Sequence, residues 1–590
     1  MSRSSATNAA CALREVTKTP TDANRFMKFL DARRLTGPSL LFDMPGAVLD
    51  VSCAPEEADA LEPLWRANVA RMRDALGWEP CDYARRNLTG GVSVAFTAMI
   101  DALYAASAIN EWAFAASLAQ TAGAPEPDFA AALGGVRDEY AQESNAALLE
   151  LQAAAAAHGV RFLWDDDYVS LGAGPGARTW PAREPPDPRS LDWSQFDDIP
   201  IGLVTGTNGK TTTVRLAKRI LTAAGLSAGI SSTDWLAVGD RIVDRGDWSG
   251  PGGARTILRQ NDVDVAVLES ARGGLLRRGL GVDRASAALI TNIAEDHLGD
   301  FGSRTIAELL DIKWIVSRAV RRAGRLILNA DDHRLVDKAR DFAGELVWFG
   351  LDVRSPIIRE HLARGGVAFV EDDGELLQLR GDRHVPICNA GDIPITLNGA
   401  ARHNVANALA AAALTSVLGV SLADIGDGLT TMSQQDNPGR CNVYDVQGKT
   451  VLIDFAHNPH AMRALFDMAE ALPARRRVLC FGQAGDRPDE LIRAMTRDAW
   501  AIGLDRVIVS ELAAYHRGRQ HGDVYSVIRD ELLSLGARSD QIAHNEQEVD
   551  SFRSALDWAD EGDLVIMLAL GGAAPIQEQL SSLGASPSVT

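Results

Sequence analysis

The chain has 590 residues, of which 46% are hydrophobic, and it carries a formal net charge of −20. This length predicts about three or four domains of ~150 residues each, and the composition is ordinary for globular domains with apolar cores. The acidic balance argues against nucleic acid and anionic membranes as main partners, although a local positive field can still bind a phosphate group.

The six cysteines are dispersed and form no C-x-x-C pair. This pattern indicates reduced thiols, and it argues against a disulfide framework or a zinc site. The polar N-terminal segment lacks the apolar core of a signal peptide, and no run approaches the ~18 apolar residues of a membrane span. We therefore expect a cytoplasmic protein without a membrane partner, and the sequence leaves a homo-oligomer open.

Residues 1–170 are predicted to form a helix-rich α+β domain. Apolar residues spaced by three and four predict helices, and one short apolar run predicts a strand. The helices are expected at 58–76, 92–118 and 136–157, and the strand at 47–51. No catalytic pattern stands out in this region. Residues 171–198 are rich in proline and glycine, which predicts an irregular linker.

Strand and helix patterns alternate over residues 199–436, which predicts a parallel sheet covered by helices. The strands are expected at 201–205, 263–268, 287–292 and 326–329, and the helices at 211–224 and 306–319. Polar residues end or follow these strands, namely Thr205, Glu269, Asn292 and Asn329. Because ligands of open α/β sheets bind outside the carboxyl ends of the strands, these positions should meet at one site.

Residues 437–590 are predicted to form a second α/β domain of Rossmann type. Short apolar strands are separated by helical segments and are expected at 451–453, 478–481, 507–509 and 564–570. The first of these strands is not followed by a G-x-G-x-x-G motif, so this domain is not expected to bind a dinucleotide by itself.

The segment VTGTNGKTTT at residues 204–213 is the most informative one in the chain. It follows an apolar strand and opens a helical run, so glycines and helix N-terminal amides can converge on an anion. Lys210 can reach the outer phosphates, and the Thr211 hydroxyl can ligate magnesium. We therefore expect ATP and Mg²⁺, although Val204 replaces the first glycine of the common Walker A loop. The alternative is a simple glycine turn.

Three further side chains follow in the central region. Glu269 ends an apolar strand and is well placed to hold magnesium, although a solvated strand end is the plainer interpretation. His297 fits either a second-metal ligand or a core histidine. Lys313 lies among apolar residues of a predicted helix, where a lysine usually extends to a salt bridge.

The chain from residue 201 to about 332 resembles the central domain of Mur ligases, and above all the Mur-ligase-like module of cyanophycin synthetase. The same resemblance continues downstream, so that about two-thirds of the chain matches in order. It is carried by TGTNGKTTT (205–213), ESARGGLLRRGLG (269–281), DHLG (296–299), RHNVAN (402–407), PGR (438–440) and DFAHNP (454–459). The ATP-grasp module of cyanophycin synthetase has no counterpart between the N-terminal region and residue 199.

This resemblance implies roles for individual residues. Thr211 and Glu269 would bind a first magnesium ion, and His297 with Glu269 would bind a second. Lys313 falls where many Mur ligases carry a carbamylated lysine. The nucleotide would be held by Thr207, Asn208, Gly209, Lys210, Thr211, Thr212, Asn404, Arg440 and His457, and the catalytic set would be Lys210, Glu269, His297, Lys313, Arg440 and Asp454.

The implied activity is an ATP-dependent carboxylate–amine ligase that forms an amide through an acyl phosphate and acts on an amino acid or peptide. One alternative is a nucleotide-binding assembly or regulatory protein that has lost ligation. A small-molecule P-loop kinase is disfavoured, because DFAHNP and Arg440 would have no purpose in it. The sequence does not identify the acid or the amine.

Overall fold

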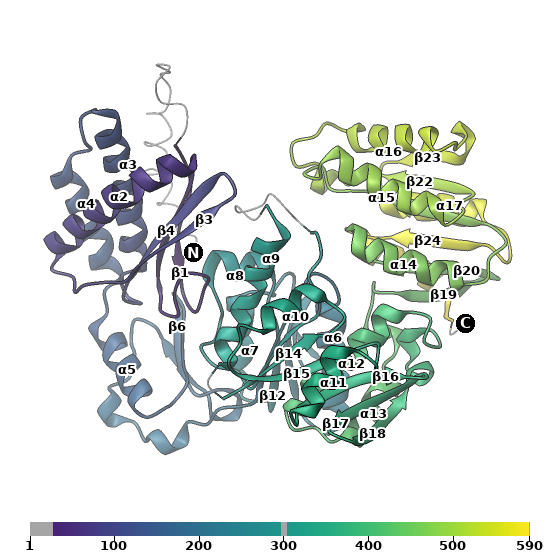
Figure 1. Ribbon diagram of the computed structural model, residues 1–590, viewed down its shortest axis with the longest axis horizontal. Helices are drawn as coiled ribbons and strands as arrows, with labels where there is room; N and C mark the ends of the chain where they lie inside the picture. The colour runs from purple at the N-terminus through teal and green to yellow at the C-terminus, as the bar shows by residue number, and fades with distance from the viewer. Residues whose placement is uncertain (1–26, 297–303, 322, 589–590) are drawn as a thin grey trace. The chain divides into compact units, whose positions relative to one another are not determined.

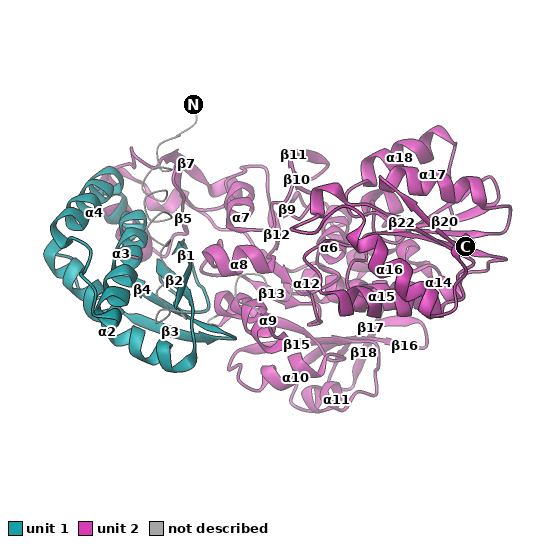
Figure 2. Cartoon of the chain, turned by 90° about the horizontal axis from the view of Figure 1, so that it is seen from above, with its two compact units in different colours: residues 1–149, 301–303 teal, residues 150–300, 304–590 magenta. Residues whose placement is uncertain are grey.

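The computed structural model describes residues 27–296, 304–321 and 323–588. The chain divides into two compact units, of which unit 1 comprises residues 1–149 with 301–303 and unit 2 comprises residues 150–300 with 304–590 (Figure 2). Among the described residues, none of the helices combines the length and the apolar character needed to cross a bilayer.

Unit 1 is an antiparallel sheet in the order β1-β2-β4-β3 with helices packed on it. The core lies between them and includes Leu49, Trp65 and Phe96, all fully buried. The α+β prediction for this region is thereby confirmed. The bounds are β1 Lys28–Leu35, β2 Gly46–Ser52, β3 Tyr83–Leu88, β4 Gly91–Thr97, α2 Pro55–Leu76, α3 Leu103–Ala122 and α4 Phe129–Glu143.

Two helix predictions need correction here. The expected helix 92–118 is wrong at its start, because Gly91–Thr97 is strand β4. The expected helix 136–157 is two helices, since α4 ends at Glu143 and α5 spans Ala146–Ala157. Asn145 separates them: its backbone N–H donates to Asp101 Oδ2 at 2.8 Å, and its Oδ1 accepts from Leu148 N at 3.1 Å.

The segment 171–198 is more ordered than an irregular linker. Strand β7, Arg178–Pro181, pairs antiparallel with β6, Tyr168–Leu171, which also pairs with β5, Phe162–Trp164. Pro181 is tolerated because it ends an edge strand, where its missing N–H costs no ladder bond. A 3-10 turn, Gly174–Gly176, lies between β6 and β7, and two more, Pro188–Ser190 and Trp193–Gln195, follow β7.

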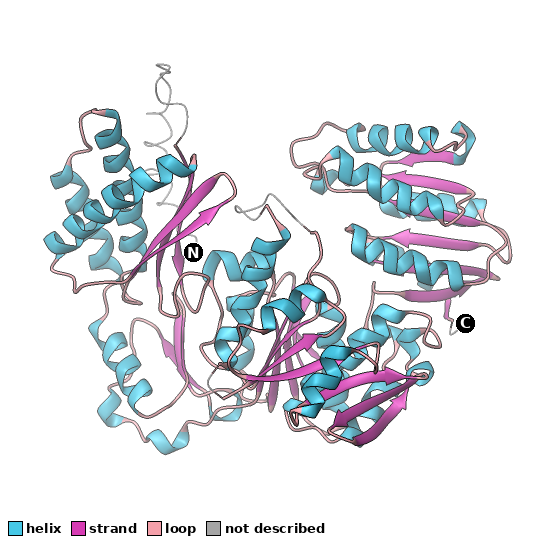
Figure 3. Ribbon diagram, viewed as in Figure 1, coloured by secondary structure: helices cyan, strands magenta, loops and turns pink. Residues whose placement is uncertain are grey.

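The central part of unit 2 is an eleven-stranded sheet in the order β11-β10-β9-β12-β8-β13-β14-β15-β16-β17-β18. The strands from β9 to β16 in this order run parallel, and helices cover them (Figures 1 and 3). Strands β8 and β12 are buried along their whole length, as parallel strands covered on both faces require.

The bounds of the central strands are β8 Ile201–Thr205, β9 Ala228–Ser231, β10 Trp235–Val238, β11 Arg241–Arg245, β12 Val265–Glu269, β13 Ala287–Ile290, β14 Arg325–Asn329, β15 Glu345–Gly350, β16 Val367–Asp372, β17 Glu375–Arg380 and β18 Arg383–Asn389. The helices are α6 Lys210–Ala223, α7 Pro251–Leu258, α8 Arg272–Arg278, α9 Ile306–Lys313, α10 His333–Ala339, α11 Pro356–Ala363, α12 Arg402–Val417 and α13 Leu422–Thr430. The expected helix 306–319 is α-helical only to Lys313, and a 3-10 segment, Trp314–Val320, continues it.

The C-terminal part is a seven-stranded sheet in the order β23-β22-β21-β24-β20-β19-β25. Strands β20 to β24 run parallel between helices, which confirms the predicted Rossmann-like domain. The strands are β19 Asn442–Val446, β20 Lys449–Asp454, β21 Arg477–Phe481, β22 Arg506–Ser510, β23 Ile542–Asn545, β24 Leu564–Leu568 and β25 Ser586–Pro587, and the helices are α14 Pro459–Ala471, α15 Asp489–Ala501, α16 Asp523–Ser534, α17 Glu548–Trp558 and α18 Ala573–Ser582.

Candidate active site

A cavity of about 730 Å³ in unit 2 is lined by both of its large sheets. The loops after β8, β13 and β14 line it from the central sheet, and those after β20, β21, β22 and β24 line it from the C-terminal sheet. The sequence-predicted site residues that line it are Thr207, Asn208, Gly209, Lys210, Thr211, Thr212, Lys313, Asn404, Arg440, Asp454 and His457. His297 lies outside the described residues.

The loop between β8 and α6 depends on two glycines in the left-handed region. Gly206 has φ +146°, and a Cβ on it would lie 1.9 Å from Thr291 Oγ1. Gly209 has φ +82°, and a Cβ on it would lie 2.2 Å from Asn407 Oδ1. Both conformation and space therefore demand glycine, and they let the chain turn sharply into helix α6.

The segment after β13 holds this loop in place. Asn292 accepts two hydrogen bonds from it, one at its backbone oxygen from Thr207 N at 2.9 Å and one at Oδ1 from Asn208 N at 3.0 Å. Lys210 begins α6, and its Nζ donates to Thr207 O at 3.0 Å. Because the first amides of a helix have no intrahelical acceptor, the start of α6 offers N–H groups and a positive dipole to an anion.

Glu269, at the end of β12, is a buried carboxylate that accepts hydrogen bonds from two hydroxyls. Its Oε2 accepts from Thr211 Oγ1 at 2.9 Å and its Oε1 from Thr233 Oγ1 at 2.8 Å, while the side chain is 2% exposed. Carboxylate and hydroxyl oxygens are ligands that a hard cation such as Mg²⁺ prefers, so this set fits magnesium. Within the described chain, no three His, Cys, Asp or Glu side chains form a metal-holding group.

Lys313, the last residue of α9, is buried under the phosphate loop. Its Nζ donates to Gly206 O at 2.6 Å, and the residue is 3% exposed. Burial, assisted by the nearby charge of Lys210, holds the pKa of Lys313 well below its ordinary value. Among the described residues Lys313 does not form the salt bridge that is usual for such a lysine, and it instead supports the backbone of the loop at Gly206.

Arg440 and Asp454 approach the cavity from the C-terminal side. The Arg440 guanidinium lies 4.2 Å from the centre of the Phe455 ring and 3.7 Å from Asp234 Oδ2. Asp454 ends β20 and accepts from Cys441 N at 2.7 Å. Burial raises the pKa of Asp454, and the charge of Arg440 opposes that effect. Arg440 and Asp454 therefore both line the cavity, and the positive charge of Arg440 favours the ionised form of Asp454.

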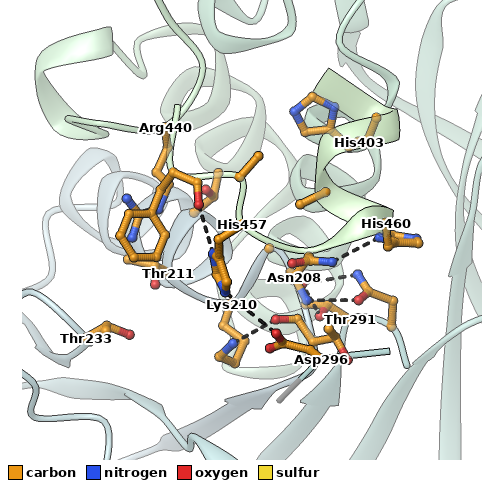
Figure 4. A pocket seen from close by; sticks show the side chains of 18 of the residues that line it. Asn208, Lys210, Thr211, Thr233, Thr291, Asp296, His403, Arg440, His457 and His460 are labelled. Carbon is orange, nitrogen blue, oxygen red and sulfur yellow. Dashed lines mark hydrogen bonds and ion pairs between the residues drawn. The ribbon is translucent and has the colours of Figure 1, made fainter. Parts of the chain in front are cut away.

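His457 also lines the cavity (Figure 4). Its Nδ1 lies 2.9 Å from Phe455 O, and its Nε2 lies 3.7 Å from Asp296 Oδ1. Burial lowers the pKa of His457, although Asp296 works against that shift. Arg487 Nη2 also donates to Asp296 Oδ1, at 3.3 Å, so Asp296 joins two C-terminal side chains to the central domain.

Asn404 lines the cavity but its amide already has partners within the protein. Its Nδ2 donates to Ile395 O at 2.8 Å, and its Oδ1 accepts from Asn407 Nδ2 at 3.2 Å. The neighbouring His403 lies with Nε2 3.1 Å from Cys441 Sγ. Burial, with a smaller contribution from His460, lowers the pKa of His403 to about 4.

His403 should make stability pH-dependent on the acid side. An unfolded histidine keeps a pKa near 6.5, so protonation as the pH falls from 6.5 towards 4 favours the unfolded chain. The loss between pH 7 and pH 5 is expected to be about 2 kcal/mol. In urea titrations, His403→Gln should remove that part of the pH dependence, while His384→Gln, at an exposed position, should not. Equal pH dependence in wild type and His403→Gln would contradict this assignment.

Several residues in the site were not predicted from the sequence. Thr233 follows β9, a strand that the sequence analysis does not predict. Had that strand been recognised, Thr233 would have been expected in the site, because ligands bind outside the carboxyl ends of parallel strands. Asn208 exchanges side-chain hydrogen bonds with Asn458, at 3.2 and 2.9 Å, and lies 3.0 Å from His460 Nδ1 (Figure 4). These pairs join residues about 250 positions apart, so no local signal could have revealed them.

Comparisons with known proteins agree with this architecture. Residues 204–415 match the Mur ligase middle domain, and residues 439–571 match the Mur ligase, glutamate ligase domain. Cyanophycin synthetase of Nostoc sp. strain PCC 7120 is 36% identical over 417 residues, which cover 68% of this chain and 46% of that protein. UDP-N-acetylmuramyl-tripeptide synthetase of Leifsonia xyli is 28% identical over 383 residues, covering 62% of this chain and 70% of that protein.

A solved structure of E. coli FolC in complex with DHPP and ADP aligns with a TM-score of 0.49 and 21% identity, covering 65% of this chain and 89% of that chain. The chain spans about half the length of the cyanophycin synthetases that it matches. The resemblance inferred from the motifs is confirmed by the two domain matches. Through its middle and C-terminal domains, this chain belongs to the Mur ligase superfamily.

Proposed function

We propose that this protein is an ATP-dependent carboxylate–amine ligase that forms an amide bond through an acyl phosphate. The observation that supports the proposal is one cavity lined by the phosphate loop, Arg440 and Asp454, with Glu269 bound to the cavity-lining Thr211. The acid and amine substrates belong to the amino acids or peptides. ATP is the energy source, and magnesium is the accompanying ion.

The phosphate loop supplies the positive charge that phosphoryl transfer needs. Lys210 and the first amides of α6 would bind the β- and γ-phosphates. Thr211 and Glu269 would hold magnesium, which supplies charge neutralisation when bound. Lys313 supports the loop through Gly206 O, and its depressed pKa favours the neutral amine to which carbon dioxide can add to give a carbamate.

The reaction then follows from the chemistry of carboxylates. A carboxylate oxygen of the acid attacks the γ-phosphorus, the bond to the β-phosphate oxygen breaks, and ADP leaves. The amine attacks the acyl carbon, the carbon–oxygen bond breaks with loss of phosphate, and the nitrogen releases a proton. Arg440 would offset negative charge from the C-terminal side, and the C-terminal domain would keep water from the acyl phosphate.

The products of the reaction test the proposal directly. The full chain is incubated with ATP, magnesium and a panel of amino acids and acidic peptides, and nucleotides are separated by chromatography. We expect substrate-dependent ADP and phosphate, with an amide product seen by mass spectrometry. AMP and pyrophosphate would contradict the acyl-phosphate route. Bound ATP without turnover for any substrate would favour a nucleotide-binding protein that has lost ligation.

A further inference from the structure

Arg215 is a buried arginine to which neither the motifs nor the mechanism gives a role. It lies on α6, the helix that begins with Lys210, and its side chain is 2% exposed. Burial lowers the pKa of Arg215 to about 10, partly offset by Asp234. Removing a guanidinium from water costs several kcal/mol unless it is paired and hydrogen-bonded. Its partners therefore show what the buried charge supports.

Those partners come from two places far apart in the sequence. Nη1 donates to Asn437 Oδ1 and to Pro438 O, both at 3.1 Å. Nη2 donates to Asp234 Oδ2 at 2.6 Å, and the guanidinium carbon lies 4.3 Å from the centre of the Trp235 ring. One side chain thus joins the phosphate-loop helix to the start of β10 and to residues 437–438.

Residues 437–441 are the crossover, the segment through which the chain passes from the central to the C-terminal domain. The crossover is tightly turned: Gly439 and Cys441 have φ of +74° and +52°. Asn442, which opens β19, accepts at Oδ1 from Gly439 N at 2.6 Å and donates from Nδ2 to Asn437 O at 3.1 Å. The crossover is therefore a compact turn fixed at one end by β19 and at the other by Arg215.

The same arrangement reaches the cavity through Asp234. Its Oδ2 accepts from Arg215 Nη2 and lies 3.7 Å from Arg440 Nη2. Arg440 in turn lines the cavity. Two guanidinium groups thus share one carboxylate oxygen. Arg215 forms a short hydrogen bond with it, whereas Arg440 forms only a longer ion pair. A loose ion pair of this kind directs Arg440 without preventing it from moving to a ligand.

We propose that Arg215 is a positioning residue that fixes the crossover to the phosphate-loop helix and, through Asp234, directs Arg440 towards the cavity. Because Lys210 and Arg215 lie on the same helix, the contacts of Arg215 connect the crossover to the helix that carries Lys210. The anchoring of the crossover stands on geometry alone, whereas its effect on turnover rests on the proposed function.

The test compares Arg215→Met with Arg219→Met in the full-length protein. Arg219 lies one turn further along α6 and donates to Thr431 Oγ1 at 3.1 Å, outside the crossover. Hydrogen exchange followed by mass spectrometry should show the amides of residues 437–442 exchanging at least ~10-fold faster in Arg215→Met, with Arg219→Met unchanged. Unchanged exchange in Arg215→Met would overturn the proposal.

Kinetics separate positioning from a general folding defect. In Arg215→Met, kcat for ATP-dependent phosphate release should fall ~10-fold or more, while the Kd for ATP changes less than ~3-fold, because the loop itself is intact. Arg215→Lys restores the positive charge but not the two Nη groups that donate to separate partners, so it should recover only part of the rate. A rise in Kd equal to the loss in kcat, or full recovery with lysine, would overturn the positioning role.

Two further variants cover a failure of Arg215→Met to fold. Asn437→Ala should reproduce the faster exchange of the crossover amides, and Asp234→Asn should lower kcat without that exchange. Slow exchange in Asn437→Ala would contradict the anchor. If the wild type releases no phosphate with any substrate, the proposed function fails, and the exchange comparison still decides whether Arg215 anchors the crossover.

Discussion

Lys210→Ala is expected to reduce ATP-dependent phosphate release by ~10³-fold, to the background of the assay. The Lys210 ammonium donates to Thr207 O and so stays close to the loop. Lys210 is the one cationic side chain among the cavity-lining residues 207–212 of the described chain. Alanine removes the charge that would balance the outer phosphates during transfer. Because the lost interaction strengthens as charge moves to the leaving group, kcat should fall more than ATP affinity.

Lys218→Ala is the matched control for this variant. Lys218 lies on the same helix, its Nζ is 3.4 Å from Asp240 Oδ1, and neither residue lines the cavity. Its loss should leave phosphate release within ~2-fold of wild type, since exposed ion pairs contribute little. A purified Lys210→Ala protein that releases phosphate at the wild-type rate would remove the nucleotide assignment of the loop.

The parts of the fold that could be predicted are those in which local pattern and environment agree. Residues 201–205 were predicted as a strand and form β8 with the same bounds, because five buried apolar or small residues precede a glycine loop. Glu269 and Asn329 were predicted at strand ends, and each is the last residue of its strand. Parallel strands then bring such residues together without further information.

The parts that could not be predicted depend on partners distant in the chain. Apolar spacings of three and four predict a helix over residues 92–118, but Val92, Val94 and Phe96 alternate as in a strand, and the segment pairs with β2. Arg215 reads in the sequence as one more polar residue of an amphipathic helix. Its burial follows from the crossover, more than 200 positions later, which covers it.

Glu269→Gln should change two measurable quantities in opposite directions. In the free protein, Glu269 is a buried carboxylate bonded to the Thr211 and Thr233 hydroxyls, so a neutral amide removes an unfavourable buried charge. The melting temperature without ligand should therefore be equal to or higher than that of wild type. The rate of phosphate release should nevertheless fall by ~10²–10³-fold, because the site for magnesium loses its negative ligand.

Thermal melts with and without a magnesium complex of a non-hydrolysable ATP analogue measure both effects. A ligand at 100 times its Kd stabilises the wild type by about 2.7 kcal/mol, and the variant should lose most of that gain. Removing magnesium with a chelator should make the wild type resemble Glu269→Gln. Asp264→Asn, at the residue just before the start of the same strand, should keep the full ligand-induced shift. An undiminished shift in Glu269→Gln would exclude Glu269 as the anchor of the metal, because the carboxylate would then contribute nothing that an amide cannot.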